Sequence, residues 1–130
     1  KFILKNNLNE DVKLIGSTTH IFNLLNASDV IVLPSTGKED FPNVIIEAMS
    51  MGKPTIGTRI AGIPEQIEDN VNGFLVEPKN EKELAIAIHK FMDTKIINSF
   101  SKKAKEKFDL NYKVEISLKK YFKLYETINK

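Results

Sequence analysis

The sequence contains no cysteine and no tryptophan, and its 130 residues include only two histidines, His20 and His89. Without cysteine the chain forms neither a disulfide framework nor a thiolate metal site, and two imidazoles do not favour a metal centre. The net charge of +2 is too small for a dedicated nucleic-acid binder. Apolar runs stay far below the roughly 18 residues of a membrane-spanning helix. No signal peptide is visible, so a cytoplasmic location is the default expectation.

The length and the overall composition are typical of one globular domain. With 42% hydrophobic and 28% charged residues, the chain is large enough to bury a core. No internal repeat or low-complexity segment interrupts it. The first residue is Lys1 rather than methionine, which suggests a piece of a longer protein.

The most informative stretch is STGKEDFPNVIIEAMSMG, residues 35–52. It follows DVIVL, residues 29–33, an almost wholly apolar run that predicts a buried parallel strand. A helix is predicted from Pro42 to about Met51, and Gly52 ends it. A helix that begins at the carboxyl end of a parallel strand suits a phosphate, and the amides of Val44 and Ile45 would bind it.

Two carboxylates flank this predicted anion site. Glu39 lies in the loop before it, and Glu47 lies about one turn inside the helix. Carboxylates accept hydrogen bonds from hydroxyls, so the arrangement suits a ligand with hydroxyls at both ends of a diphosphate, such as a nucleotide sugar. The alternative is that Glu39 is a solvated loop residue and Glu47 a charge on the helix surface.

Three ordered blocks resemble a known family: EDFPNVIIEAMSMGKPTIGT, then AGIPEQI, then NGFLVEP. Their order and spacing are similar to those in the donor-binding domain of the retaining glycosyltransferases of family 4, the glycosyl transferases group 1, which have the GT-B fold. The resemblance extends to about residue 92. One difference is Asp40, where the family usually has glycine. In the family the turn at residues 59–64 approaches the donor, although its glycine and its proline suit any turn.

The resemblance implies that the whole protein moves a sugar from a UDP- or GDP-linked donor to an acceptor with retention of configuration, without a metal or other cofactor. Glu39 would bind sugar hydroxyls and Glu47 the ribose hydroxyls, as the catalytic pair. The donor-binding residues would be Gly16, Ser17, Asp40, Phe41, Pro42, Asn43, Val44, Ile45 and Glu47. A glycosidase-like acid/base pair is less favoured, because one glutamate lies in a loop and the other in a helix.

The alternation of elements predicts an α/β fold, a Rossmann-like three-layer sandwich with a parallel sheet and additional C-terminal helices. Predicted strands are residues 12–15, 29–33, 54–58 and 74–76, and predicted helices are residues 19–26, 42–51, 64–67, 81–92, 97–108 and 112–129. The last two helices carry aromatic stripes. In the GT-B pattern the last helix crosses to a second domain, so we expect its apolar stripe to be partly exposed here.

The family resemblance also predicts what is missing. A donor domain of the family has two further strands, with a Gly-rich turn and an Arg and a Lys for the phosphates, and none of these precedes Val12. Residues 1–130 would then be one partial nucleotide-sugar-binding domain, inactive without the acceptor domain. Either residues 12–15 pair directly with residues 29–33, or a second copy fills the sheet edge as a homodimer. Any peripheral membrane contact would belong to the full-length protein.

Two other functional classes compete with this interpretation. The first is a non-catalytic module that binds a nucleotide or nucleotide sugar. The second is a flavodoxin-like or receiver-like signalling domain, which shares the alternation but needs clustered aspartates after its first strand. No such cluster is present. His20 is interpreted as an exposed residue at a helix start, with a role at the ligand as the alternative.

Overall fold

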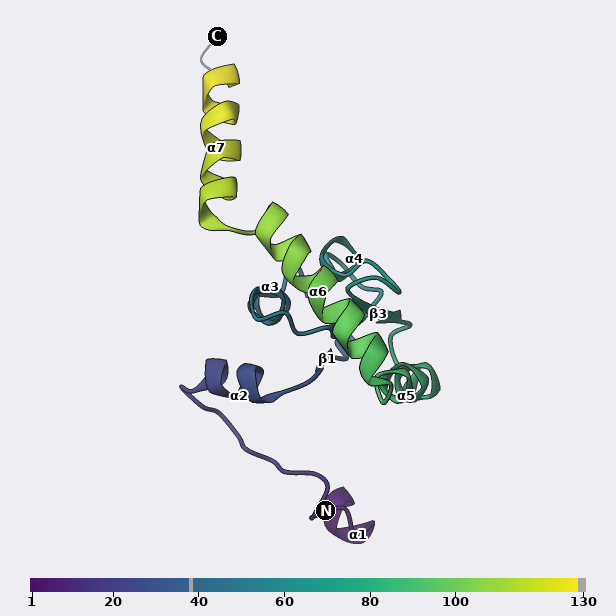
Figure 1. The fold of residues 1–130 in the computed structure, drawn as a ribbon. Coiled ribbons are helices and arrows are strands. Elements are labelled where there is room, and N and C mark those ends of the chain that lie inside the picture. Colours follow the sequence, from purple (N-terminus) through teal and green to yellow (C-terminus); the bar gives the residue numbers. More distant parts are fainter. Residues whose placement is uncertain (38, 129–130) are drawn as a thin grey trace.

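The computed structural model describes residues 1–37 and 39–128 of the chain (Figure 1). Its helices and strands follow one another in this order: α1 (Phe2–Lys5), α2 (Ile21–Ala27), β1 (Ile31–Leu33), α3 (Asn43–Ser50), β2 (Thr55–Thr58), α4 (Ile63–Gln66), β3 (Gly73–Val76), α5 (Glu81–Lys90), α6 (Thr94–Asn111) and α7 (Val114–Ile128). Most boundaries differ from the predicted ones by one to three residues. The predicted end of the last helix at Asn129 lies outside the described residues.

The three strands form one parallel sheet in the order β1-β2-β3. Val32 lies opposite Ile56, which lies opposite Phe74. The strands β2 and β3 are buried throughout, as their apolar runs predict. Although β1 and β3 are both edge strands, only β1 is exposed, and Val32 of β1 is 38% exposed. The prediction that β1 is a fully buried strand is therefore wrong, because α5 packs mainly on β2 and β3 and leaves this face of β1 less covered.

Helices cover both faces of the sheet, which confirms the three-layer α/β class. On one face, Ile45 and Met49 of α3 pack with Ile63 of α4, Leu75 of β3 and Ala104 of α6. The opposite face holds a second apolar cluster, made by Ile56, Phe74, Val76, Ala87 and Phe91. The alternation along β3, where Leu75 faces one cluster and its two neighbours face the other, is that of a strand buried on both sides.

The helix α3 is ended by its sequence in the predicted way. Gly52 follows the C-cap residue Met51 and has φ +66°, a left-handed conformation that glycine adopts without cost. Its N–H donates to the Met49 carbonyl, and the N–H of Lys53 donates to the Ala48 carbonyl, each at 2.9 Å. This pair of bonds is a Schellman motif. Helix α5 begins at the predicted cap, since the Asn80 side chain accepts from the Glu83 N–H.

The first 20 residues contradict one prediction. Residues 12–15 form no strand, and Leu14 and Ile15 are 86% and 63% exposed. They therefore do not pair with β1. A strand needs a neighbour for its backbone groups, and in the described residues this segment has none. Helix α2 begins at Ile21, not at Thr19, with His20 as an exposed N-cap residue.

The last helix projects away from the sheet (Figure 1). No residue of α7 is buried, and its apolar side chains include Phe122, which is 65% exposed, and Tyr125, which is 62% exposed. The expected exposure of this stripe is confirmed, and it extends over the whole described helix. The packed part of the molecule thus ends near Tyr112, where α6 ends.

Candidate functional site

The loop of residues 34–42 leaves the carboxyl end of β1 and leads into α3. Lys38 of this loop lies outside the described residues. The hydroxyl of Ser35 donates to Glu39 Oε2 at 3.1 Å, and the Ser35 carbonyl accepts from Thr58 Oγ1 at 2.8 Å. Thr58 is the last residue of β2 and is 2% exposed. The half-buried carboxylate of Glu39 is therefore positioned through Ser35 by the neighbouring strand.

The second half of the loop is held by the segment around α4. The Gly62 N–H donates to the Asp40 carbonyl at 2.8 Å. A Cβ atom on Gly62 would lie 2.1 Å from that oxygen, so any larger residue would displace the loop. This close approach explains a glycine in the turn of residues 59–64, which the sequence alone left ambiguous. The turn therefore touches the loop that carries the predicted donor-binding residues.

A buried polar chain fixes the start of α3. The Gln66 side chain, completely buried, donates from Nε2 to the Pro42 carbonyl at 3.1 Å. The Gln66 carbonyl in turn accepts from Asn72 Nδ2 at 3.2 Å. Pro42, the predicted helix start, is the N-cap residue of α3, and the helix begins one position later at Asn43. The contacts of Gln66 and Asn72 were not predicted, because long polar side chains between two turns leave no periodic signal.

Phe41 lies on the outer side of the same loop. Its ring centroid is 6.3 Å from that of Tyr112, with the planes tilted by 55°. Burial raises the pKa of the Tyr112 hydroxyl above its ordinary value, and the charge of Glu65 adds to this rise. Tyr112 is therefore a neutral phenol at pH 7, which suits its packing against an aromatic ring.

The first turn of α3 presents Asn43, Val44 and Ile45, whose N–H groups have no carbonyl one turn earlier within the helix. The Ile45 N–H donates to the Pro42 carbonyl at 3.3 Å, and the Ile45 side chain is fully buried. Glu47 follows on the same helix and is half-buried. The structure thus places Glu39 in the loop that leads into α3 and Glu47 one turn inside that helix, and among the described residues no hydrogen bond joins the two carboxylates.

Gly16 and Ser17 are placed elsewhere. They lie in the segment between α1 and α2, where Gly16 has φ +74° and both residues are exposed. Among the described residues, no hydrogen bond joins either residue to the loop of residues 34–42. Their proposed contact with the donor rests on the resemblance alone.

Two features that the described residues lack bear on other classes of site. No group of three or more acidic or histidine side chains is close enough to hold a metal ion. Over the same residues, no helix is both long and apolar enough to cross a membrane.

Comparison with known proteins places this geometry in a family. The family model of the glycosyl transferases group 1 matches residues 1–94. The N-acetyl-alpha-D-glucosaminyl L-malate synthase of Bacillus anthracis is 32% identical over 125 residues, which are 95% of this chain and 32% of that protein.

Solved structures give the same result. The structure of Anabaena Alr3699/HepE in complex with UDP is similar with a TM-score of 0.85 and 32% identity, over 95% of this chain and 35% of that chain. The C-terminal domain of the group 1 protein LpcC from Francisella tularensis gives a TM-score of 0.76 and 26% identity, over 87% of this chain and 60% of that chain. The chain spans about a third of the length of the first two relatives. From its α/β fold, its matched blocks and these relatives, the chain is a member of the glycosyl transferases group 1 and corresponds to the C-terminal domain.

Proposed function

We propose that the chain is the donor-binding part of a glycosyltransferase that moves a sugar from a nucleotide sugar to an acceptor with retention of configuration. The observation that carries this proposal is the loop of residues 34–42. Hydrogen bonds from Thr58, Gly62 and Gln66 hold it against the start of α3, with a glutamate on either side. A site held this firmly is suited to binding a ligand in one orientation.

Each part of the site has a role in the proposed reaction. The N–H groups of Asn43 and Val44, together with that of Ile45 once its long bond to the Pro42 carbonyl is exchanged, bind the diphosphate and stabilise its charge as the bond to the anomeric carbon breaks. Glu39 accepts hydrogen bonds from the sugar hydroxyls, and Glu47 accepts them from the ribose. Relatives support a diphosphate ligand, because Anabaena Alr3699/HepE was solved with UDP and with UDP-glucose. The same assignment makes UDP the first nucleotide to test, with GDP as the comparison.

The chain alone binds the donor weakly and transfers no sugar in this proposal. The proposal assigns the diphosphate to helix amides and to no arginine or lysine, so affinity for UDP is expected near a Kd of about 1 mM. The acceptor domain and the transfer reaction belong to the whole protein. A second copy of the chain over the open edge of β1, as a homodimer, stays a prediction of the sequence.

The test is calorimetry of the chain with UDP and GDP, comparing wild type with Glu47→Gln. Replacing the carboxylate by an amide is expected to weaken UDP binding by about 1–3 kcal/mol, because a charged acceptor of two ribose hydroxyls is lost. Glu115→Gln, an exposed glutamate in the first turn of α7, is the matched control and is expected to bind like wild type. Equal affinity of Glu47→Gln and wild type would contradict the ribose assignment.

The non-catalytic module is the other candidate, and an activity assay on the full-length protein separates the two. A transferase consumes the nucleotide sugar only when an acceptor is present. Glu39→Gln is expected to abolish this acceptor-dependent consumption. A full-length protein that binds UDP-glucose but releases no UDP with any acceptor would favour the non-catalytic module.

A further inference from the structure

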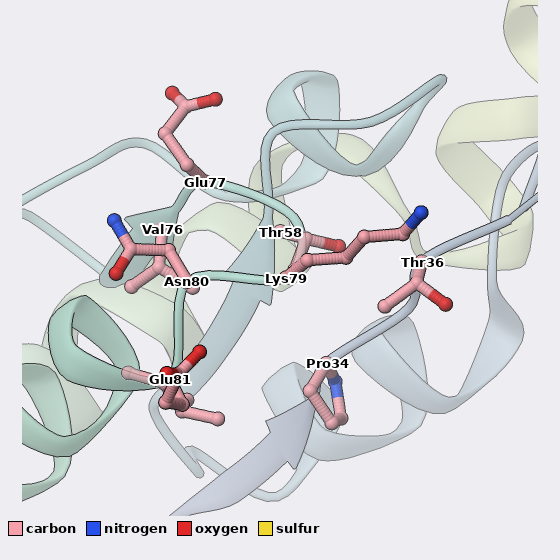
Figure 2. Close-up of a pocket in the computed structure, with 9 residues that line it drawn as sticks. Pro34, Thr36, Thr58, Val76, Glu77, Lys79, Asn80 and Glu81 are labelled. Atoms are coloured by element: carbon pink, nitrogen blue, oxygen red, sulfur yellow. The ribbon is translucent and has the colours of Figure 1, made fainter.

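A pocket of about 310 Å³ lies beyond the carboxyl ends of all three strands (Figure 2). We call it the strand-end pocket. Its wall includes Thr36 in the loop after β1, Thr58 at the end of β2 and Lys79 in the turn after β3. Thr36 belongs to the loop of the proposed donor site and Thr58 holds that loop, but none of the three residues is proposed to contact the donor. The volume is at the lower limit of known ligand pockets and fits one small ring rather than a nucleotide.

The lining of the strand-end pocket combines an apolar surface with polar groups of both charges. Pro34, Val76 and Leu84 supply the apolar surface, and Lys79 and Glu81 supply the charges. Glu77 also lines the pocket, but its carboxylate lies 3.5 Å from the guanidinium of Arg59 and pairs with it. An anion would meet Glu81 and a cation would meet Lys79, so neither is favoured. A neutral sugar suits this lining, because its ring has an apolar C–H face and its hydroxyls both donate and accept hydrogen bonds.

The polar rim is held in place by its backbone. Lys79 has φ +62°, a left-handed conformation that residues other than glycine rarely adopt. The turn around it is closed by the Asn80 N–H, which donates to the Glu77 carbonyl at 3.2 Å, and by Glu83 Oε2, which accepts from the Glu77 N–H at 2.9 Å. This conformation directs the Lys79 side chain toward Thr36, whereas Glu77 points away from it (Figure 2).

The strand-end pocket shares structure with the donor site. Thr58, in the pocket wall, donates to the Ser35 carbonyl at 2.8 Å, and the Ser35 hydroxyl donates to Glu39 at 3.1 Å. Thr36, the next residue, lines the pocket. A ligand in the pocket and a donor sugar at Glu39 would therefore lie on either side of the same short loop.

We infer that the strand-end pocket binds one neutral sugar unit of the acceptor. This inference rests on the proposed function, because only a transferase brings a second sugar beside the donor. Lys79 donates to one hydroxyl of the ring and Glu81 accepts from another, while Pro34 and Leu84 contact its C–H face. The C-terminal domain then contributes to acceptor recognition as well as to donor binding.

The test is a pair of NMR titrations of the chain, one with methyl α-D-glucopyranoside and one with UDP. We expect the glycoside to shift the methyl signals of Val76 and Leu84 with roughly millimolar affinity. UDP is expected to shift the amide signals of Val44 and Ile45 instead. This inference is overturned, and the proposed donor site stays intact, if the glycoside leaves the methyl signals of Val76 and Leu84 unchanged while UDP shifts the amide signals of α3. UDP that leaves α3 unchanged overturns the proposed function instead.

Lys79→Gly is the decisive variant, because glycine suits the left-handed backbone there and the fold is preserved. We expect it to weaken glycoside binding about five-fold, the effect of losing one hydrogen bond, and to leave UDP binding unchanged. Lys82→Ala, an exposed lysine of α5 outside the pocket, is the matched control. Wild-type glycoside affinity in Lys79→Gly, or stronger shifts of Val76 and Leu84 with inorganic phosphate than with the glycoside, would overturn the inference.

Discussion

Residues 29–112 and the two ends of the chain both carry many apolar side chains, but the two regions differ in how far these side chains are buried. Of the buried apolar residues in the described chain, only Leu25 lies outside residues 29–112. The ends expose theirs, as Leu14 and Phe122 do. The total accessible surface is 9399 Å², whereas a compact monomer of 14.7 kDa exposes about 6,900 Å². The comparison shows that an amphipathic pattern predicts an element but not the partner that covers it.

The largest expected contrast between the two regions comes from matched truncations. Ile45 is completely buried in the apolar cluster of α3, α4 and α6. Ile45→Ala is expected to lower the free energy of unfolding by about 2–5 kcal/mol. Leu14→Ala, at a side chain that is 86% exposed, is expected to change it by less than about 0.5 kcal/mol. Urea denaturation followed by circular dichroism measures both, and similar losses would remove the distinction between the regions.

A second contrast lies between two glycines beside or within the loop of residues 34–42. Gly62→Ala would place a Cβ 2.1 Å from the Asp40 carbonyl oxygen and is expected to cost about 1–3 kcal/mol. It should also weaken UDP binding, because the loop must move. Gly37→Ala is the control, since nothing lies within 4 Å of the added atom. Urea denaturation and calorimetry with UDP would show the difference, and a Gly62→Ala protein with wild-type values would contradict this packing.

A smaller effect is expected at the start of α6, the helix that joins the packed region to α7. The Asp93 carboxylate accepts a hydrogen bond from the Lys95 N–H at 2.8 Å. Asp93→Ala removes this cap and is expected to lower the free energy of unfolding by about 1 kcal/mol, whereas Asp93→Asn keeps the cap. Thermal unfolding of the two variants tests the cap. An equal loss of stability in both variants would show that the Asp93 side chain does not cap α6.

The smallest expected effect concerns the bend between α6 and α7. The ammonium of Lys113, in an ion pair 3.1 Å from Oδ1, lowers the pKa of Asp109, and Lys105 at 3.5 Å adds to this. Because the folded pKa is below the unfolded one, this stabilisation is present above the unfolded pKa and is lost as the pH falls through the folded value. Lys113→Met is expected to raise the pKa of Asp109 in an NMR titration, with Lys119→Met as the control. An unchanged pKa would show that the Lys113 contact is absent in solution.

The sequence predicted the elements of residues 29–112 well, because strands, caps and turns there are encoded by near neighbours. Gly52 ended α3 and Asn80 capped α5 as predicted. The segment of residues 12–15 failed, because its alternating pattern is satisfied only if a neighbouring strand exists. The prediction that β1 is fully buried failed for a related reason, because burial depends on distant elements that cover the strand.

The site could be predicted in part. The position of Glu39 before α3 and of Glu47 within it follows from the order of loop and helix. The hydrogen bonds of Thr58 and Gln66 join residues 23 and 24 positions apart, and no local pattern encodes such distances. The strand-end pocket could have been sought, because the carboxyl ends of parallel strands share one edge, but the left-handed Lys79 that shapes it carries no composition signal.

The open edge of β1 has a consequence for aggregation. An unpaired strand edge is a template onto which other chains add strands, and this hazard grows with the length of the edge. Here the strand has three residues, the charged Asp29 precedes it, and Pro34, which follows at once, has no N–H to offer an incoming strand. The edge is therefore too short and too interrupted to start a long stack of strands.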